Sequence, residues 1–198
     1  MSLEKLMNRV ERYKKENNHS LYQVIDRYCD YLEMRKELGY DMENEVFLFP
    51  KNLEKKHQEM VNEKNKRADE LYITRMKSEY GEIEKKFKKL DKKYHYEKDG
   101  LEIRPARDAE EIVMEGRKQH HCVGRETYLK KHNQGKTFIL LLRKMENLDA
   151  PYYTIEILGN EILQWYGKFD KKPDKEKIEK WLEEYKRHLE EKKVGKAA

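Results

Sequence analysis

Residues 116–138 contain the groups best suited to chemistry: two adjacent histidines, one of the two cysteines of the chain, and glycines at turn-like positions. Cys122 would precede a helix start with basic residues nearby, and both features favour a reactive thiolate. His120 or His121 is then a candidate base. His132, or a residue far along the chain, is the alternative because sequence neighbours seldom face each other. A reactive thiol is therefore one interpretation of this segment, and its partner is left open.

The same loop also suits an anion site. Gly124 would let a ligand approach the backbone, and a helix start offers unpaired N–H groups to a phosphate. The residues expected to bind an anion or nucleic acid are Arg104, Arg107, Arg117, Lys118, Gly124, Arg125 and Lys136. A third interpretation is that His120, His121 and Cys122 merely pack a corner with their polar atoms satisfied.

No metal and no cofactor is expected. The histidine pair beside Cys122 lacks the paired ligand spacing of structural zinc sites, and the other cysteine, Cys29, falls within a helical pattern. Five residues before Gly135 stands Lys130 rather than glycine, so the sequence "QGKT" is not a phosphate loop of the Walker type.

A predicted hairpin at residues 151–167 supplies two further candidates. Gly159–Asn160 favours a tight two-residue turn. Such a turn places Gln164 opposite Ile155, on an apolar face, where a buried amide needs hydrogen-bond partners or a ligand. Glu156 falls on the other face and is expected to be an exposed strand carboxylate, with a catalytic role as the alternative. The candidate catalytic residues are thus His121, Cys122, Gln164 and Glu156.

The elements around these residues predict an α+β region. Residues 101–105 and 137–143 have strand patterns, and the second run is apolar enough for a central strand buried on both faces. Asp108 with Glu111 fits a capping box ahead of a helix that ends near residues 116–119. Asp174 caps the last helix, whose expected buried stripe is Ile178, Trp181, Leu182, Tyr185 and Leu189.

The N-terminal half reads as helical. Ser20 with Gln23 fits a capping box, and Gly39 suits the left-handed residue after the helix that follows. The run "EVFLFP" ends at Pro50 and predicts a strand or an extended anchor. A long charged helix then begins near Leu53, and Gly81 is its weak point.

This long helix carries a narrow apolar seam. Its members follow coiled-coil spacing: Met76, Tyr80, Ile83, Phe87 and Leu90. Because the seam is short, we expect it to pack on residues 21–38 rather than to form a dimerisation coil, although a homo-oligomer remains open. The expected fold is α+β: N-terminal helices including a long charged one, then a small antiparallel or mixed sheet of at least three strands packed with helices. The expected domains are residues 1–97, a helical region, and 98–198, an α+β core.

Composition narrows the function classes. Charged residues make up 42% of the 198 residues and hydrophobic ones 37%, and 44 basic against 39 acidic residues give a net charge of +5. This mixed balance is weak evidence for nucleic acid, because dedicated binders concentrate basic residues. No apolar run reaches about 18 residues, so we expect no membrane insertion and a cytoplasmic protein.

An ordered series of motifs resembles the PcfJ-like family of conjugative plasmids, phages and other mobile elements of low-GC Gram-positive bacteria. The motifs are "LFPKNLEKKHQEM", "IRPARDAEEIVMEGRKQHHCVG", "GKTFILLLRK", "PYYTIEI" and "ILQWYGKFDK". Tyr128 belongs to the same series. The family signature corresponds to His121, Cys122, Val123, Gly124, Thr154, Ile155, Glu156, Gln164 and Gly167. One departure is Phe169–Asp170, where many relatives have asparagine.

The resemblance implies a setting, a mobile element, rather than a reaction. The expected function is an accessory protein that acts with DNA or RNA, or with a mobile-element protein complex. One alternative is an enzyme, a transferase or hydrolase acting on a nucleotide or nucleic acid through Cys122 or His121. The other is a helical scaffold for protein interaction.

Overall fold

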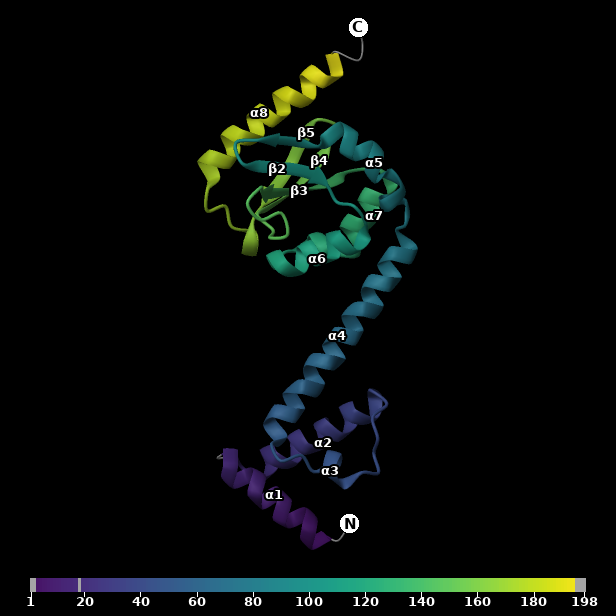
Figure 1. Cartoon of the computed structure of the whole chain (residues 1–198), viewed down its shortest axis with the longest axis vertical. Coiled ribbons are helices and arrows are strands. Elements are labelled where there is room, and N and C mark those ends of the chain that lie inside the picture. The colour runs from purple at the N-terminus through teal and green to yellow at the C-terminus, as the bar shows by residue number, and fades with distance from the viewer. Residues whose placement is uncertain (1–2, 18, 195–198) are drawn as a thin grey trace. The chain divides into compact units, whose positions relative to one another are not determined.

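A computed structural model of the chain describes residues 3–17 and 19–194; the outer ends of the two expected domains, residues 1–2 and 195–198, lie outside this description. The chain forms two compact units, Met1–Leu71 and Tyr72–Ala198 (Figure 1). The division falls inside helix α4 (Leu53–Glu79), ahead of residue 98, where the sequence changes from a helical to a strand pattern.

The first unit contains α1 (Leu3–Asn17), α2 (Leu21–Glu37), α3 (Glu45–Leu48) and the start of α4. The predicted capping box of α2 is confirmed: Ser20 and Gln23 exchange side-chain and backbone hydrogen bonds. Gly39 has φ +76°, as expected after a helix end. The expectation for "EVFLFP" is wrong, because Asn44 accepts a hydrogen bond from the Val46 amide and starts the short helix α3 there.

The charged helix breaks where glycine weakens it. Helix α4 ends at Glu79 and α5 (Glu82–Tyr94) begins directly after Gly81. Four of the five residues of the seam are buried inside the second unit, which differs from the expected packing on residues 21–38. Met76, Tyr80 and Ile83 are buried against α6 and α7, while Leu90 joins the core beneath α8. Tertiary packing within its own unit therefore occupies the seam.

The second unit is built on one antiparallel sheet in the order β1-β2-β3-β4-β5, which confirms the α+β class. Its strands are β1 (Tyr96–Lys98), β2 (Leu101–Pro105), β3 (Phe138–Lys144), β4 (Tyr153–Leu158) and β5 (Glu161–Tyr166). The prediction of a central strand is confirmed by β3, where Leu140 and Leu142 contribute to one core and Ile139 and Leu141 to the other. Apolar residues on both faces require a layer of helices on each side.

Figure 1 shows those two layers around the sheet. Helices α6 (Ala109–Gln119) and α7 (Glu126–Gln134), joined by the 3-10 turn η1 (Cys122–Gly124), cover one face. Helix α8 (Lys175–Val194) covers the other, and its predicted apolar stripe is buried there, as expected. Residues 106–137 thus cross the α6–α7 face between β2 and β3, which brings the loop of Cys122 over the sheet.

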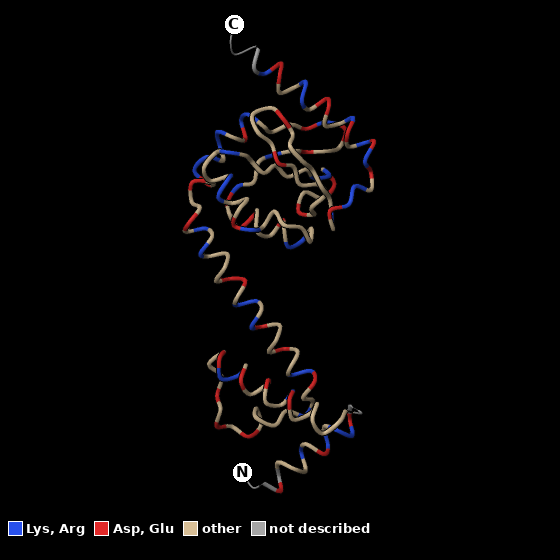
Figure 2. Tube along the Cα trace, turned by 180° about the vertical axis from the view of Figure 1, so that it is seen from behind, with Lys and Arg blue, Asp and Glu red and all other residues tan. Residues whose placement is uncertain are grey.

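Basic and acidic residues are interspersed along the helices of both units (Figure 2). In the described residues, none of the helices is both long enough and apolar enough to cross a membrane.

Candidate functional site

The hairpin turn forms as predicted, but the predicted register holds only beside it. A β-bulge lies between Glu156 and Ile157, so Glu156, not Ile155, is the partner of Gln164. A bulge inserts one residue and reverses the faces of every residue beyond it. Gln164 therefore shares a face with Glu156 and Thr154, beneath η1 and α7, and the expectation of an apolar surrounding is wrong.

Glu156 is buried, with 5% of its surface exposed, and this corrects the expectation of an exposed carboxylate. Its Oε1 accepts a hydrogen bond from Thr137 at 2.7 Å, and its Oε2 accepts one from the Gln164 amide at 2.6 Å. Lys131 Nζ lies 3.5 Å from Oε1. The carboxylate thus has the partners that a buried charge requires.

The loop after α6 is fixed by a close approach of two backbones. A Cβ atom on Gly124 would lie 2.9 Å from the Val113 carbonyl oxygen, and one on Gly116 would lie 2.4 Å from the Gly124 nitrogen. The missing side chain of Gly124 therefore accommodates α6, not a ligand as the sequence suggested. His120, at φ +55°, ends α6 in the left-handed conformation and turns the chain into η1.

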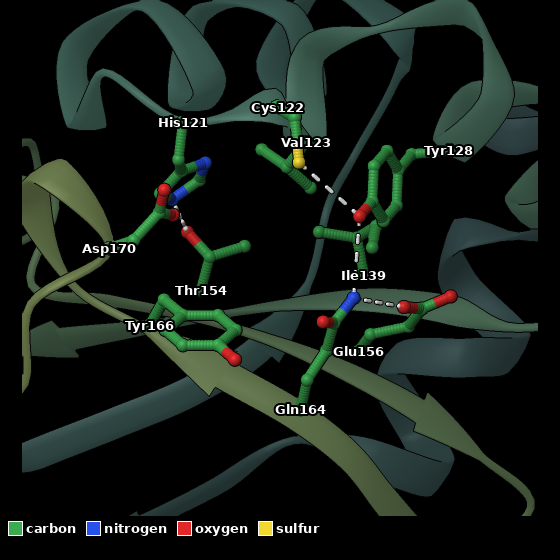
Figure 3. A pocket seen from close by; sticks show the side chains of 10 residues that line it. All are labelled: His121, Cys122, Val123, Tyr128, Ile139, Thr154, Glu156, Gln164, Tyr166 and Asp170. Carbon is green, nitrogen blue, oxygen red and sulfur yellow. Dashed lines mark hydrogen bonds between the residues drawn. The ribbon is translucent and has the colours of Figure 1, made fainter.

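This loop and the sheet enclose a cavity of about 280 Å³, here called the thiol pocket (Figure 3). Its lining residues are His121, Cys122, Val123, Tyr128, Ile139, Thr154, Glu156, Gln164, Tyr166 and Asp170. The structure thus places all four candidate catalytic residues around one space. Figure 3 shows two groups of side chains, one around His121 and one around Gln164.

The first group links His121 to a buried ion pair. The Thr154 hydroxyl donates to Glu115 Oε1 at 2.7 Å, so its oxygen accepts from His121 Nε2 at 3.2 Å. Arg143 donates to both oxygens of Glu115, and the two side chains are 5% and 1% exposed. This chain of contacts orients the imidazole and places the proton on Nε2, which leaves Nδ1 as the nitrogen that can exchange a proton.

The second group links Cys122 to Glu156. The Gln164 amide nitrogen uses its two protons on Glu156 and, at 3.4 Å, on the Tyr128 oxygen. The Tyr128 hydroxyl in turn lies 3.3 Å from Cys122 Sγ. Figure 3 shows the amide oxygen of Gln164 on the opposite side, toward the open part of the pocket. The partner of the thiol is therefore Tyr128, and His121 faces Thr154 instead.

Burial sets the ionisation of the histidines here. It lowers the pKa of His121 against the opposing charges of Glu115 and Asp170, which favours a neutral base near pH 7. Contact with Cys122, followed by burial, raises the pKa of Tyr128, so its hydroxyl keeps its proton. Behind the pocket wall, burial lowers the pKa of His132 to about 4, and its Nδ1 accepts from the Ile139 amide.

The predicted basic residues do not gather at this pocket. Arg104 forms a bidentate pair with Glu111 and lines, with Arg107 and Lys118, a separate polar cavity that also contains carboxylates. The Arg117 guanidinium lies 5.9 Å from the ring of Tyr72, while Arg125 and Lys136 are exposed. Only half of the predicted capping box forms. The Asp108 side chain caps α6, but the Glu111 carboxylate accepts hydrogen bonds from Arg104 and the Arg107 amide instead of the Asp108 amide.

Several residues of the site escaped the sequence analysis: Glu115, Tyr166, Asp170 and Arg143, together with the role of Thr154. Two of them carried a readable signal. Glu115 stands among the buried positions of α6, and Arg143 interrupts an apolar strand. A charged side chain in such a position needs a partner of opposite charge. The contacts of Tyr166 and Asp170 depend on the bulge and on the turn after β5, which no local pattern reveals.

Comparison with known proteins agrees with the resemblance noted in the sequence. A family model described as "PcfJ-like protein" matches residues 27–182, a range that includes the whole thiol pocket. An uncharacterized protein of Listeria innocua serovar 6a, Lin1253/Lin1744, is 30% identical over 146 residues, which is 74% of this chain and 30% of the relative's own length. No solved structure matches the chain. The chain belongs to the PcfJ-like protein family.

Proposed function

We propose that this chain is an accessory protein of a conjugative plasmid or phage that acts with nucleic acid or a nucleoprotein complex. We further propose that the thiol pocket receives one nucleotide unit. The family membership supports the setting. Cys29 and Cys122 are free thiols, which suits the reducing cytoplasm as the compartment.

The observation that carries the proposal is the polar lining of the thiol pocket. Its volume is near the lower end for small-molecule sites, which suits one base or nucleoside and excludes a duplex. None of its ten lining residues is Lys or Arg, and two are carboxylates, Glu156 and Asp170. The pocket would therefore repel a phosphate and accept the amino and imino donors of a base.

Particular groups suit the base. The free oxygen of Gln164 and the Asp170 carboxylate are acceptors, and the Tyr166 ring, 37% exposed, offers a stacking surface at the pocket. Because the Gln164 amide is held on its nitrogen side by Glu156, its oxygen is presented in one orientation. Such a fixed amide is a typical means of recognising a base edge.

The test is binding of a fluorescent 12-nucleotide single strand by anisotropy. Gln164→Met keeps the side-chain volume but removes the acceptor, and we expect about tenfold weaker binding. The control is Gln134→Met, at the exposed end of α7. Equal affinity of the two variants would contradict a role for the pocket, and the absence of binding at low salt would contradict the nucleic-acid function itself.

A second candidate is acid–base catalysis on the bound nucleotide. It is favoured by one observation: a buried carboxylate, Glu115, orients His121 through Thr154, as the third member of a catalytic triad orients its base. Cys122 as a nucleophile has less support because its contact is Tyr128. If His121 is the base, His121→Gln should lower any turnover of nucleotide or oligonucleotide by about 100-fold or more while binding persists.

The scaffold alternative draws no support from the apolar seam, because Met76, Tyr80 and Ile83 are already buried within their own unit.

A further inference from the structure

A second cavity lies on the other side of the turn that follows β5. It measures about 440 Å³ and includes Lys118, Gln119, Tyr152, Lys168, Phe169 and Lys171 in its lining; we call it the lysine cavity. We propose that this cavity binds the phosphodiester backbone of single-stranded nucleic acid. The proposal rests on the function proposed above and adds the place where the phosphates lie.

The first argument is charge. Three lysines line the cavity, and none of its lining residues is Asp or Glu. Lys168 and Lys171 form no salt bridge among the described residues, in a chain where many lysines do, whereas Lys118 also lines the separate cavity that contains carboxylates. Two carboxylates are near in sequence but turned to other uses: Asp170 lines the thiol pocket, and Asp174 accepts from the Tyr152 hydroxyl. An uncompensated cluster of ammonium groups is the usual signature of phosphate binding.

The second argument is an unpartnered amide. Gln119 lines the cavity with only 2% of its surface exposed, and its Nε2 has no hydrogen-bond partner among the residues that the structure describes. Most buried polar groups are paired, so an orphan donor among lysines indicates a missing acceptor. A phosphate oxygen has the charge and the lone pairs to be that acceptor.

The third argument is an aromatic platform on a strained turn. Phe169, with φ +56° and 56% exposed, stacks on the His120 ring at 4.6 Å between centroids. Left-handed backbone is unusual for a bulky residue, and Asp170 has it as well, so this turn holds its shape at a cost. Exposed rings beside lysines are typical of single-strand binding.

The turn Gly167–Lys171 separates the two spaces, since Phe169 lines the lysine cavity and Asp170 lines the thiol pocket. A strand whose phosphates lie on the lysines could therefore place a base in the thiol pocket. The lysine cavity then binds the negatively charged phosphates, and the thiol pocket, which contains two carboxylates, binds the uncharged base.

The test compares two double variants with the same loss of charge. Lys168→Gln/Lys171→Gln should weaken binding of a labelled (dT)12 strand by about tenfold and lower the salt slope by about 1.4. The control, Lys88→Gln/Lys89→Gln on the exposed face of α5, should change the affinity less than twofold. An equal effect of the two pairs would overturn the site, because net charge alone would then explain binding.

Gln119→Leu adds a readout that a structural role would not give. Removing an unpaired buried donor should raise the denaturation midpoint, while the affinity for (dT)12 should fall about tenfold. A variant that is more stable and binds normally would contradict the assignment.

Inorganic pyrophosphate separates this proposal from the function on which it rests. If the wild type binds no (dT)12 at low salt, the nucleic-acid function fails. The cavity is then judged by whether pyrophosphate raises the melting temperature of the wild type but not of Lys168→Gln/Lys171→Gln. Such a shift would keep an anion site for free phosphates, and its absence would remove the site as well.

Discussion

The thiol pocket and the lysine cavity share one turn but are built in opposite ways. Around the thiol pocket, Glu156 is held by Thr137 and Gln164, and His121 is held by Thr154 and, through it, by Glu115. In the lysine cavity, Lys168 and Lys171 are exposed and form no salt bridge with any described residue, and the buried Gln119 amide has no hydrogen-bond acceptor there. The comparison teaches that a hydrogen-bond network with all its partners present fixes the geometry of a pocket, whereas charges without partners indicate a surface that binds a charged ligand.

Loss of the buried pair of Glu115 and Arg143, beside the thiol pocket, should have the largest effect on the free energy of unfolding. Glu115→Ala leaves the charge of Arg143 in the core without its carboxylate, so we expect a loss of about 3–5 kcal/mol in the free energy of unfolding. Both tryptophans of the chain, Trp165 and Trp181, lie in the second unit, so their fluorescence during urea unfolding follows this unit. The control Glu184→Ala removes an exposed partner of Lys98 and should not shift the midpoint. A similar midpoint for both variants would break the comparison.

The histidine behind the thiol pocket should make stability depend on pH. His132 has a pKa of about 4 when folded and an ordinary value of 6.5. Between these values the unfolded chain binds the extra proton, so stability is full above pH 6.5 and falls toward pH 4 by about 3 kcal/mol. Urea unfolding at pH 7.5 and 4.5 should give a smaller difference for His132→Gln than for the wild type. The same difference in both proteins would exclude His132 as the cause.

The glycine contact under the thiol loop should be intolerant of one methyl group. Gly124→Ala would press Cβ against the Val113 carbonyl, and we expect a loss of about 1–3 kcal/mol. Gly81→Ala is the matched control: φ is −62° and the nearest atom, the Lys77 oxygen, is 3.6 Å from the new Cβ, so alanine should be neutral or stabilising. Tryptophan-monitored unfolding distinguishes the two, and a loss at position 81 with none at 124 would reverse our account.

The lysine cavity should show the smallest effect on stability. Lys168 and Lys171 are exposed and form no salt bridge in the described part of the chain, and Lys168 has only an exposed contact with the Phe169 ring, so Lys168→Gln/Lys171→Gln should change the free energy of unfolding by no more than about 0.5 kcal/mol. A larger loss would mean that these lysines support the fold, and the contrast between the regions would weaken.

How far the sequence predicts this molecule depends on the range of the forces involved. The Ser20 capping box, Gly39 and the break near Gly81 follow from local backbone preferences, and each is confirmed. The apolar stripe of α8 follows from helical periodicity. The prediction that the apolar seam packs on residues 21–38 was wrong, because the periodicity of a helix shows that a face is buried but not which core buries it.

The site was harder to predict for one specific reason. The thiol loop could be recognised from residue types, but the bulge beside Glu156 reverses the face of Gln164 and brings both side chains under Tyr128. A bulge is selected by packing across the sheet, and no turn residue marks it in the sequence. The burial of Glu156 follows from the same distant contacts.

The most direct test of the central claim, that the thiol pocket receives a nucleotide unit, is alkylation of Cys122 with and without a single strand. Both thiols are exposed, and Cys29, on α2 in the other unit, is the internal control. Saturating (dT)12 should slow iodoacetamide labelling of Cys122, measured by mass spectrometry of its peptide, and leave Cys29 unchanged. Lys168→Gln/Lys171→Gln should lose this protection at the same strand concentration. Equal labelling of Cys122 in the bound and free wild-type protein would contradict the claim.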